Sequence, residues 1–266
     1  MPHTPAPPST RPMAVYALTP GGAALARRIA GALGGTLYLA ERLCAATTEG
    51  AASGMPGAAA IPTTQPFASL ADLVARTFRL HSGHVFVAAT GIVVRCIAPH
   101  ITSKAQDPCV VVCDQRGAFA ISLLSGHLGG GNDLARQVAA VTGGTPVITT
   151  ATDTEGLPSF DLLAARAGLA MADIAMVRHV NGALLAGETV WICDPGDALG
   201  LRTTGTLAGE AGTDHIGTHD APGSSADGAG APHHSAHLFR FVAAPADLPP
   251  DAPSVLVTPH DHLAAP

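Results

Sequence analysis

The chain has 266 residues, 47% of them hydrophobic, and a formal net charge of −6 with neutral histidines. Such a chain can bury one large core or two smaller ones, and it is not a disulfide-stabilised miniprotein. Because lysine and arginine form no run, nucleic acid and anionic membrane surfaces are not expected as partners. The five cysteines are odd in number and lack CxxC spacing, so we expect reduced thiols and a cytoplasmic location.

The amino-terminal part of the sequence predicts a strand, a turn and a helix. Residues 1–12 are proline-rich and are expected to form a flexible tail, without the apolar segment of a signal peptide. Residues 13–18 form a strand-like apolar run, and residues 23–33 have helical spacing, with Thr19 placed to cap the helix. The turn lacks GxGxxG, so a dinucleotide site is not favoured. Residues 44–66 are expected to form a loop.

Strand-like and helical segments continue to alternate after this loop. Residues 69–80 have helical apolar spacing with Ser69 as a capping residue, and CVVVC at 109–113 predicts a strand buried on both faces. The sequence therefore predicts an α/β fold, a mostly parallel open sheet with helices on both faces. Further strands are expected at 84–89, 119–124 and 146–148.

The composition changes near residue 170. We expect one domain at 13–170 and a smaller, partly irregular α/β lobe at 171–266, with a disordered segment rich in histidine and glycine at about 195–235. Spacings of three and four among its histidines suit metal ligands, but the glycine, proline and serine around them argue against a helix, so no metal site is predicted. These histidines include His215, His219, His233, His234 and His237.

A glycine-rich stretch carries the clearest functional signal. At 119–140 a strand-like run breaks into SGHLGGGND and resumes as a helix. Glycines let backbone amides approach a ligand, and the first amides of a helix favour an anion. Ser125 and His127 can both exchange protons with a bound molecule, while Asn132 or Asp133 is expected to cap the helix. The alternative is that the turn serves only chain geometry.

Other polar turns also follow predicted strands. Thr90 and Gly91 come directly after one strand, and Arg95 stands in apolar surroundings, as either a carboxylate clamp or an exposed arginine on a short helix. If the sheet is mostly parallel, four turns converge on one edge, where open α/β sheets collect ligands. The four turns are 19–22, 90–95, 125–133 and 149–153.

These motifs together resemble one known family. TGIVVRCIAP from residue 90, KxxDP from 104, VVVCDQRGAFAISLLSGHLGGGNDLA from 110 and PVITTATD from 146 resemble the amino-terminal domain of the CbiG family. Members of that family are the cobalt-precorrin-5A hydrolases of anaerobic cobalamin biosynthesis. VRHVNGALLAGETVWIC from residue 177 is similar to the family's middle region.

The resemblance implies a reaction in which water opens the ring A lactone and a two-carbon fragment leaves as acetaldehyde. From the chemistry that this reaction needs, we expect His127 to act as general base or water positioner and Ser125 to be its hydrogen-bond partner or an alternative nucleophile. Amides at 129–132 are expected to be oxyanion or carboxylate donors. Arg95 and Lys104 would clamp carboxylates. The full set of substrate-binding candidates is Thr90, Gly91, Arg95, Lys104, Gly126, Gly129, Gly130, Asn132, Asp133, Thr149, Thr150 and Asp153.

The resemblance also bears on cofactors and partners. No resident cofactor is implied, because the substrate carries the cobalt. Many relatives continue into a carboxyl-terminal domain, and this chain stops about where that domain would begin, so either that domain is a separate polypeptide partner or the chain is a truncated member. The alternatives are a corrinoid-binding module that works with such a partner, and a nucleotide- or sugar-binding α/β domain unrelated to corrinoids.

Overall fold

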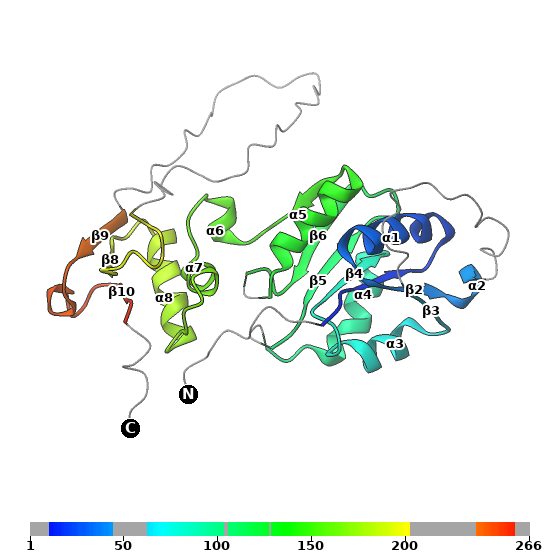
Figure 1. Cartoon of the computed structure of the whole chain (residues 1–266), viewed down its shortest axis with the longest axis horizontal. Helices are drawn as coiled ribbons and strands as arrows, with labels where there is room; N and C mark the ends of the chain where they lie inside the picture. Colours follow the sequence, from blue (N-terminus) through cyan, green and yellow to red (C-terminus); the bar gives the residue numbers. More distant parts are fainter. Residues whose placement is uncertain (1–10, 45–62, 104–105, 128, 203–237, 259–266) are drawn as a thin grey trace, which may run out of the picture. The chain divides into compact units, whose positions relative to one another are not determined.

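The structure is a computed structural model in which the chain forms two compact units, Ala6–Thr149 and Thr150–Pro266 (Figure 1). Each unit has its own hydrophobic core. The residues that the structure describes are 11–44, 63–103, 106–127, 129–202 and 238–258.

The first unit is built on a seven-stranded sheet in the order β3-β2-β1-β4-β5-β6-β7. Strands β1 to β5 pair in parallel, β6 pairs antiparallel with β5, and β7 is parallel to β6. The prediction of a mostly parallel open sheet is thus confirmed. The strands are β1 (Ala14–Ala17), β2 (Thr36–Ala40), β3 (Thr64–Phe67), β4 (Gly83–Val87), β5 (Cys109–Cys113), β6 (Phe119–Leu124) and β7 (Thr145–Val147).

The antiparallel direction of β6 overturns the expectation that all four polar turns share one edge. Leu124, at the end of β6, pairs with Val110 near the start of β5. The turns after β6 and β7 therefore lie at the edge where β1 to β5 begin, opposite the turns after β1 and β4. The cause is the short connection at 114–118, since a parallel crossover needs a dozen or more residues. Asp114 closes this hairpin by accepting hydrogen bonds from the amides of Arg116 and Phe119 at 2.8 and 2.7 Å.

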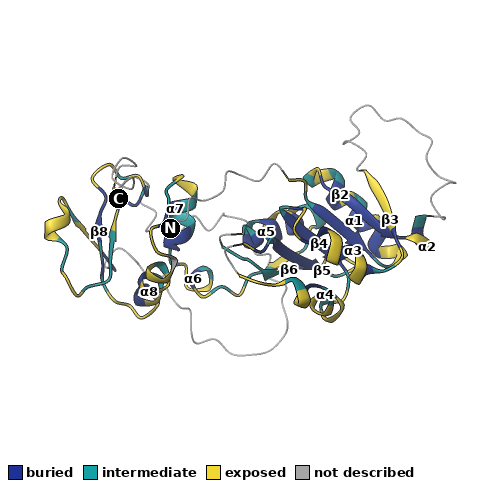
Figure 2. Ribbon diagram, turned by 90° about the horizontal axis from the view of Figure 1, so that it is seen from below, coloured by how far each residue is buried: buried dark blue, intermediate teal, exposed yellow. Residues whose placement is uncertain are grey.

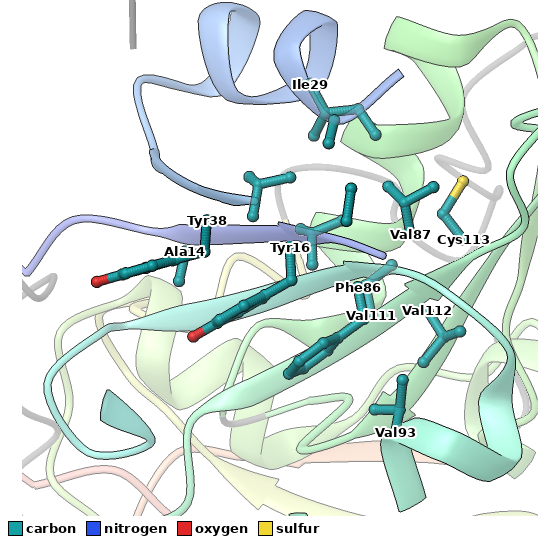
Figure 3. Close-up of a cluster of buried hydrophobic side chains, with 14 of the residues drawn as sticks. Ala14, Tyr16, Ile29, Tyr38, Phe86, Val87, Val93, Val111, Val112 and Cys113 are labelled. Atoms are coloured by element: carbon teal, nitrogen blue, oxygen red, sulfur yellow. The ribbon is translucent and has the colours of Figure 1, made fainter. Parts of the chain in front are cut away.

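Helices cover both faces of the sheet, as predicted. Figure 3 shows Ile29 of α1 on one side of the strands and Val93 of α4 on the other, and Figure 2 shows buried strands between helices with exposed outer surfaces. Thr19 and Ser69 cap α1 and α3 as expected, since their hydroxyls accept from Gly22 N and Asp72 N. The helices are α1 (Pro20–Leu33), α2 (Glu41–Cys44), α3 (Leu70–Thr77), α4 (Thr90–Ile97), the 3-10 helix η2 (Ala98–His100) and α5 (Gly131–Thr142).

Two segments differ from the expected local structure. Residues 64–66, predicted as loop, belong with Phe67 to edge strand β3, in which Pro66 pairs with Leu39. Proline is tolerated there because an edge strand leaves one side without ladder hydrogen bonds. Residues 195–202, predicted as part of a disordered segment, are ordered and place Leu199 and Leu201 in a core. The other part of that segment, 203–235, lies outside the described residues, as do the five named histidines and residues 1–10 of the predicted tail. Arg11, near the end of that tail, is described, and its guanidinium donates to Arg79 O at 2.8 Å.

The second unit has a three-stranded parallel sheet in the order β10-β8-β9. Its core includes Val180, Leu184, Val190 and Ile192. Its helices and strands agree with the α/β character expected for the smaller lobe. The elements are α6 (Ala151–Thr154), α7 (Phe160–Arg166), α8 (Ile174–Leu185), β8 (Val190–Cys193), β9 (Phe239–Val242), the 3-10 helix η4 (Pro245–Asp247) and β10 (Ser254–Leu256).

The division between the units falls between Thr149 and Thr150, earlier than the boundary expected at residue 170. Helix α7 explains the difference. Its first residue, Phe160, is buried in the second core, where its ring centre lies 6.2 Å from that of Phe239 in an edge-to-face contact. The segment that appeared to close the first domain therefore begins the second unit.

Candidate functional site

The glycine-rich turn between β6 and α5 has a tightly constrained backbone. Ser125 and Gly130 have φ angles of 55° and 79°, a conformation that is ordinary for glycine and strained for serine. A Cβ atom at Gly129 would lie 2.4 Å from Ser125 Cβ, and one at Gly126 would lie 2.7 Å from Asn132 Oδ1. Glycine at 129 is therefore required by packing against Ser125, and a side chain at 126 would displace the Asn132 amide.

The amides of this turn form hydrogen bonds within it. Gly130 N donates to His127 O at 2.9 Å, Gly131 N to Ser125 O at 3.0 Å, and Asn132 N to Gly126 O at 3.0 Å. These amides were the expected donors to an oxyanion or a carboxylate. Because the carbonyls of the turn already engage them, they hold the shape of the loop in this structure.

Ser125 and His127 both lie half-buried in the turn. Ser125 Oγ donates to the carbonyl oxygen of Asp107 at 3.0 Å, so the hydroxyl proton is directed to the backbone rather than to the imidazole. Asp107 was not singled out from the sequence, although it belongs to the KxxDP motif. Its buried carboxylate accepts from Thr102 N and Thr102 Oγ1, each at 2.9 Å, which fixes the loop ahead of β5.

Helix α5 begins before the two residues that were expected to cap it. Gly130 is the N-cap and provides no side chain, so neither Asn132 nor Asp133 has that role. Asn132 is buried in the first turn, and Asp133 accepts from Arg136 Nη1 at 3.0 Å on the half-exposed surface. This leaves His127 as the titratable side chain of the turn itself.

The turns after β1 and β4 lie at the opposite edge, beside the point where the strand order reverses. This is the usual ligand position of an open α/β sheet. Here, however, Arg95 Nη1 donates to Gly91 O at 3.1 Å, and Arg42 Nη2 donates to Leu18 O. Both guanidinium groups therefore stabilise local backbone. The structure separates Thr90, Gly91 and Arg95 from the glycine-rich turn.

The remaining candidates fall in different parts of the chain. Thr149 follows β7, which runs in the same direction as β6, and thus lies toward the edge that holds the glycine-rich turn. Thr150 and Asp153 belong to the second unit, where Thr150 precedes α6 and Asp153 is in its first turn. Lys104 lies outside the described residues.

A buried network of histidine and tyrosine is a feature that the sequence did not reveal. His84 Nδ1 accepts from the Tyr16 hydroxyl at 2.9 Å and His84 Nε2 donates to Phe78 O at 2.9 Å. His81 Nε2 accepts from the Tyr38 hydroxyl at 3.0 Å. Burial lowers the pKa of His84 to about 4 and also lowers that of His81. The partners are 68 and 43 residues apart, so no local pattern links them.

Within the described ranges, no group of three or more histidine, cysteine or acidic residues is arranged to hold a metal ion, and no helix is long and apolar enough to cross a membrane. All five cysteines are free thiols, as expected, and burial raises the pKa of Cys109 and Cys113 to about 11. These thiols are therefore protonated structural residues at neutral pH.

The second unit contains an apolar cavity of about 270 Å³ beside α8 and β10. Phe160, Met171 and Val180 are among the residues that line it. Its one ionisable lining residue, Asp173, caps α8 by accepting from Ala175 N at 2.7 Å. This cavity is thus lined mainly by apolar side chains, and its carboxylate serves as a helix cap.

The fold and this turn define the class: a two-unit α/β protein whose first unit carries a histidine on a glycine-rich strand-to-helix turn. Residues 72–153 match the family described as Cobalamin synthesis G N-terminal, and residues 158–266 match the Cobalamin biosynthesis central region. The chain belongs to the CbiG family, of which it contains these two regions.

Relatives with curated names agree with this placement. The chain is 41% identical over 179 residues to a cobalt-precorrin-5A hydrolase from Salmonella typhimurium, covering 67% of this chain and 47% of the relative. It is 38% identical over 122 residues to a cobalt-precorrin-5A hydrolase from Priestia megaterium, covering 46% of this chain and 33% of the relative. The chain thus spans about half the length of the Salmonella protein.

A solved structure is also similar to this chain. It is the crystal structure of a cobalamin biosynthesis protein G homolog from Sulfolobus solfataricus, 19% identical, with a TM-score of 0.41. The match covers 69% of this chain and 49% of that chain.

Proposed function

We propose that this chain is a cobalt-precorrin-5A hydrolase of anaerobic cobalamin biosynthesis. The observation that supports the proposal is the 41% identity to a curated cobalt-precorrin-5A hydrolase, together with consecutive matches to two regions of the CbiG family. In the proposed reaction, water adds to the carbonyl carbon of the ring A lactone and the C–O bond of the lactone breaks, which leaves a carboxylate and a free hydroxyl. That hydroxyl then loses its proton, and the carbon–carbon bond between the two-carbon fragment and the macrocycle breaks. The macrocycle carbon keeps the electron pair and takes up a proton, and the fragment leaves as acetaldehyde, giving cobalt-precorrin-5B.

We assign the proton transfer in this reaction to His127. A neutral imidazole can take a proton from the attacking water and later return it to the leaving oxygen. Its place in the turn is set by Gly126 and Gly129, because a side chain at either position would collide with the turn. Ser125 has a positioning role instead, since its hydroxyl ties the turn to Asp107.

The proposal requires no resident cofactor. Lactone opening by water is an acid-base reaction, so a positioned base and a polar environment for the developing oxyanion are the groups that it needs. The cobalt ion belongs to the substrate. We also propose a cytoplasmic location and no nucleic-acid partner, on the grounds of composition and charge.

A second candidate is a corrinoid-binding module that needs a separately encoded CbiG carboxyl-terminal partner. The internal hydrogen bonds of the turn favour it, because the amides of Gly130, Gly131 and Asn132 are engaged by carbonyls of the same loop. An oxyanion formed at this turn would then need donors from another polypeptide.

An acetaldehyde assay separates the two candidates. Purified chain is incubated with cobalt-precorrin-5A, and the acetaldehyde released is measured through NADH oxidation by alcohol dehydrogenase. The hydrolase proposal expects release by the parent chain and a rate at least about 100-fold lower for His127→Ala. His179→Ala is the matched control, because His179 is exposed on α8 of the second unit. Tight corrinoid binding without release would support the module, and a parental rate for His127→Ala would remove the catalytic role.

A further inference from the structure

A pocket of about 280 Å³ opens where the end of α3 meets η2 in the first unit. It was not foreseen from the sequence, because its two walls come from different helices. Its floor includes Phe78 and its rim is polar and cationic. The rim residues are Arg76, Arg79, His100 and Thr102.

The two arginines of the pocket differ in how they are held. Arg79 Nη2 donates to Thr102 Oγ1 at 2.8 Å and lies 3.6 Å from Asp107 Oδ1, with its side chain 50% exposed. No hydrogen bond or ion pair to another described residue occupies the guanidinium of Arg76, which is exposed in the last turn of α3. The ring of His100 packs on Phe78 with its centre 5.9 Å away.

This pocket is positive in a chain whose net charge is −6. Asp107, the acidic group that contacts its rim, is buried and already accepts two hydrogen bonds from Thr102. Arg76 and Arg79 therefore leave an excess of positive charge at the mouth. Guanidinium groups over an apolar floor suit a carboxylate on a hydrophobic framework, because the fork of donors matches the two carboxylate oxygens.

The pocket and the glycine-rich turn meet at the same residue. Arg79 lies against the side chain of Asp107, and Ser125 Oγ donates to the carbonyl of Asp107. Both features therefore lie at the edge where β4 and β5 begin. Arg95, the clamp expected from the sequence, directs its guanidinium to the first turn of α4 instead.

We propose that the Arg76–Arg79–His100 pocket binds a peripheral carboxylate of the corrinoid substrate and so positions the macrocycle against the turn that carries His127. The inference rests on the proposed function and adds binding residues to it. The structural alternative is that Arg76 only stabilises the carboxyl end of α3 through the helix dipole. That role would change stability and leave ligand affinity unaltered.

Equilibrium binding to two matched corrinoids tests the proposal. The probes are dicyanocobyrinic acid, which carries free peripheral carboxylates, and its heptamethyl ester, which has none. We expect the parent chain to bind the acid more tightly than the ester, and Arg76→Ala to weaken acid binding about tenfold without changing ester binding. Arg76→Lys should recover part of the affinity, and Arg178→Ala, an exposed arginine on α8, should match the parent.

The outcomes distinguish a carboxylate-binding pocket from a purely structural role of Arg76. Equal affinity of the parent and Arg76→Ala for the acid would overturn the pocket assignment and leave the proposed function intact. If the parent binds neither corrinoid, the acetaldehyde assay decides the proposed function, and the pocket is judged separately with tricarballylate in a thermal-shift assay. Stabilisation of the parent but not of Arg76→Ala by that tricarboxylate would still support a carboxylate pocket, whereas equal shifts would overturn it.

Discussion

The buried His84 should make the first unit sensitive to acid. Its side chain is fully buried and hydrogen-bonded at both ring nitrogens, to Tyr16 and to the carbonyl of Phe78. Because that carbonyl can only accept, Nε2 carries the proton and Nδ1 accepts from the tyrosine hydroxyl. Protonation at Nδ1 would force that hydrogen bond to reverse, with the tyrosine oxygen as acceptor, and would place a charge among aromatic rings.

The magnitude follows from the pKa of His84. Burial lowers it from 6.5 to about 4, and nearby His81 adds in the same direction. Folding therefore favours the neutral ring, so this contribution is fully present above pH 6.5 and is lost as pH falls toward 4. The interval between these pKa values corresponds to about 3 kcal/mol of unfolding free energy, an upper value for this single group.

Urea unfolding at several pH values between 7.5 and 4.5 measures the effect. Far-UV circular dichroism follows the whole chain, and fluorescence of Trp191, in β8, follows the second unit separately. His84→Gln is the matched variant, because its amide can still donate to Phe78 O but does not titrate. We expect a smaller loss of stability on acidification for this variant. Equal acid sensitivity in the parent and the variant would refute the assignment to His84.

Three further substitutions test the turn, the opposite edge and a helix. Gly129→Ala places a Cβ 2.4 Å from Ser125 Cβ, so we expect at least tenfold slower acetaldehyde release with an unchanged Trp191 unfolding curve; parental turnover would contradict this packing. Arg95→Ala should keep turnover within about twofold of the parent, and a larger loss would return the carboxylate clamp to α4. Gly31→Ala, with open space around its added Cβ, should raise the unfolding free energy of the first unit by about 0.5–1 kcal/mol; a lower melting temperature would contradict it.

Much of the fold could be predicted because its signals are local. The apolar runs of β1, β4 and β5 and the capping residues Thr19 and Ser69 each lie within a few positions of the element that they specify. The direction of β6 was also within reach, since the connection from Cys113 to Phe119 is too short for a parallel crossover. The expectation that the four polar turns share one edge was wrong because it required β6 to run parallel to β1 and β4.

The candidate site depended far more on tertiary structure. From the sequence came the glycine-rich turn, its Ser125 and His127, and the family resemblance, since all of these lie in continuous segments. The structure alone decided that the amides of the turn bind its own carbonyls, and that the guanidinium of Arg95 donates to Gly91 O. Those outcomes depend on backbone angles and side-chain conformations that no residue pattern specifies.

The same division holds for the arginine pocket. Arg76 and Arg79 look like ordinary charged residues at the end of an amphipathic helix, and His100 lies beyond the next helix in the chain. They line one pocket because α3 and α4 both run back to the edge where β4 and β5 begin. The sequence thus determined which side chains and which local elements are available. The long-range packing of helices on the sheet determined which of those side chains line the same pocket.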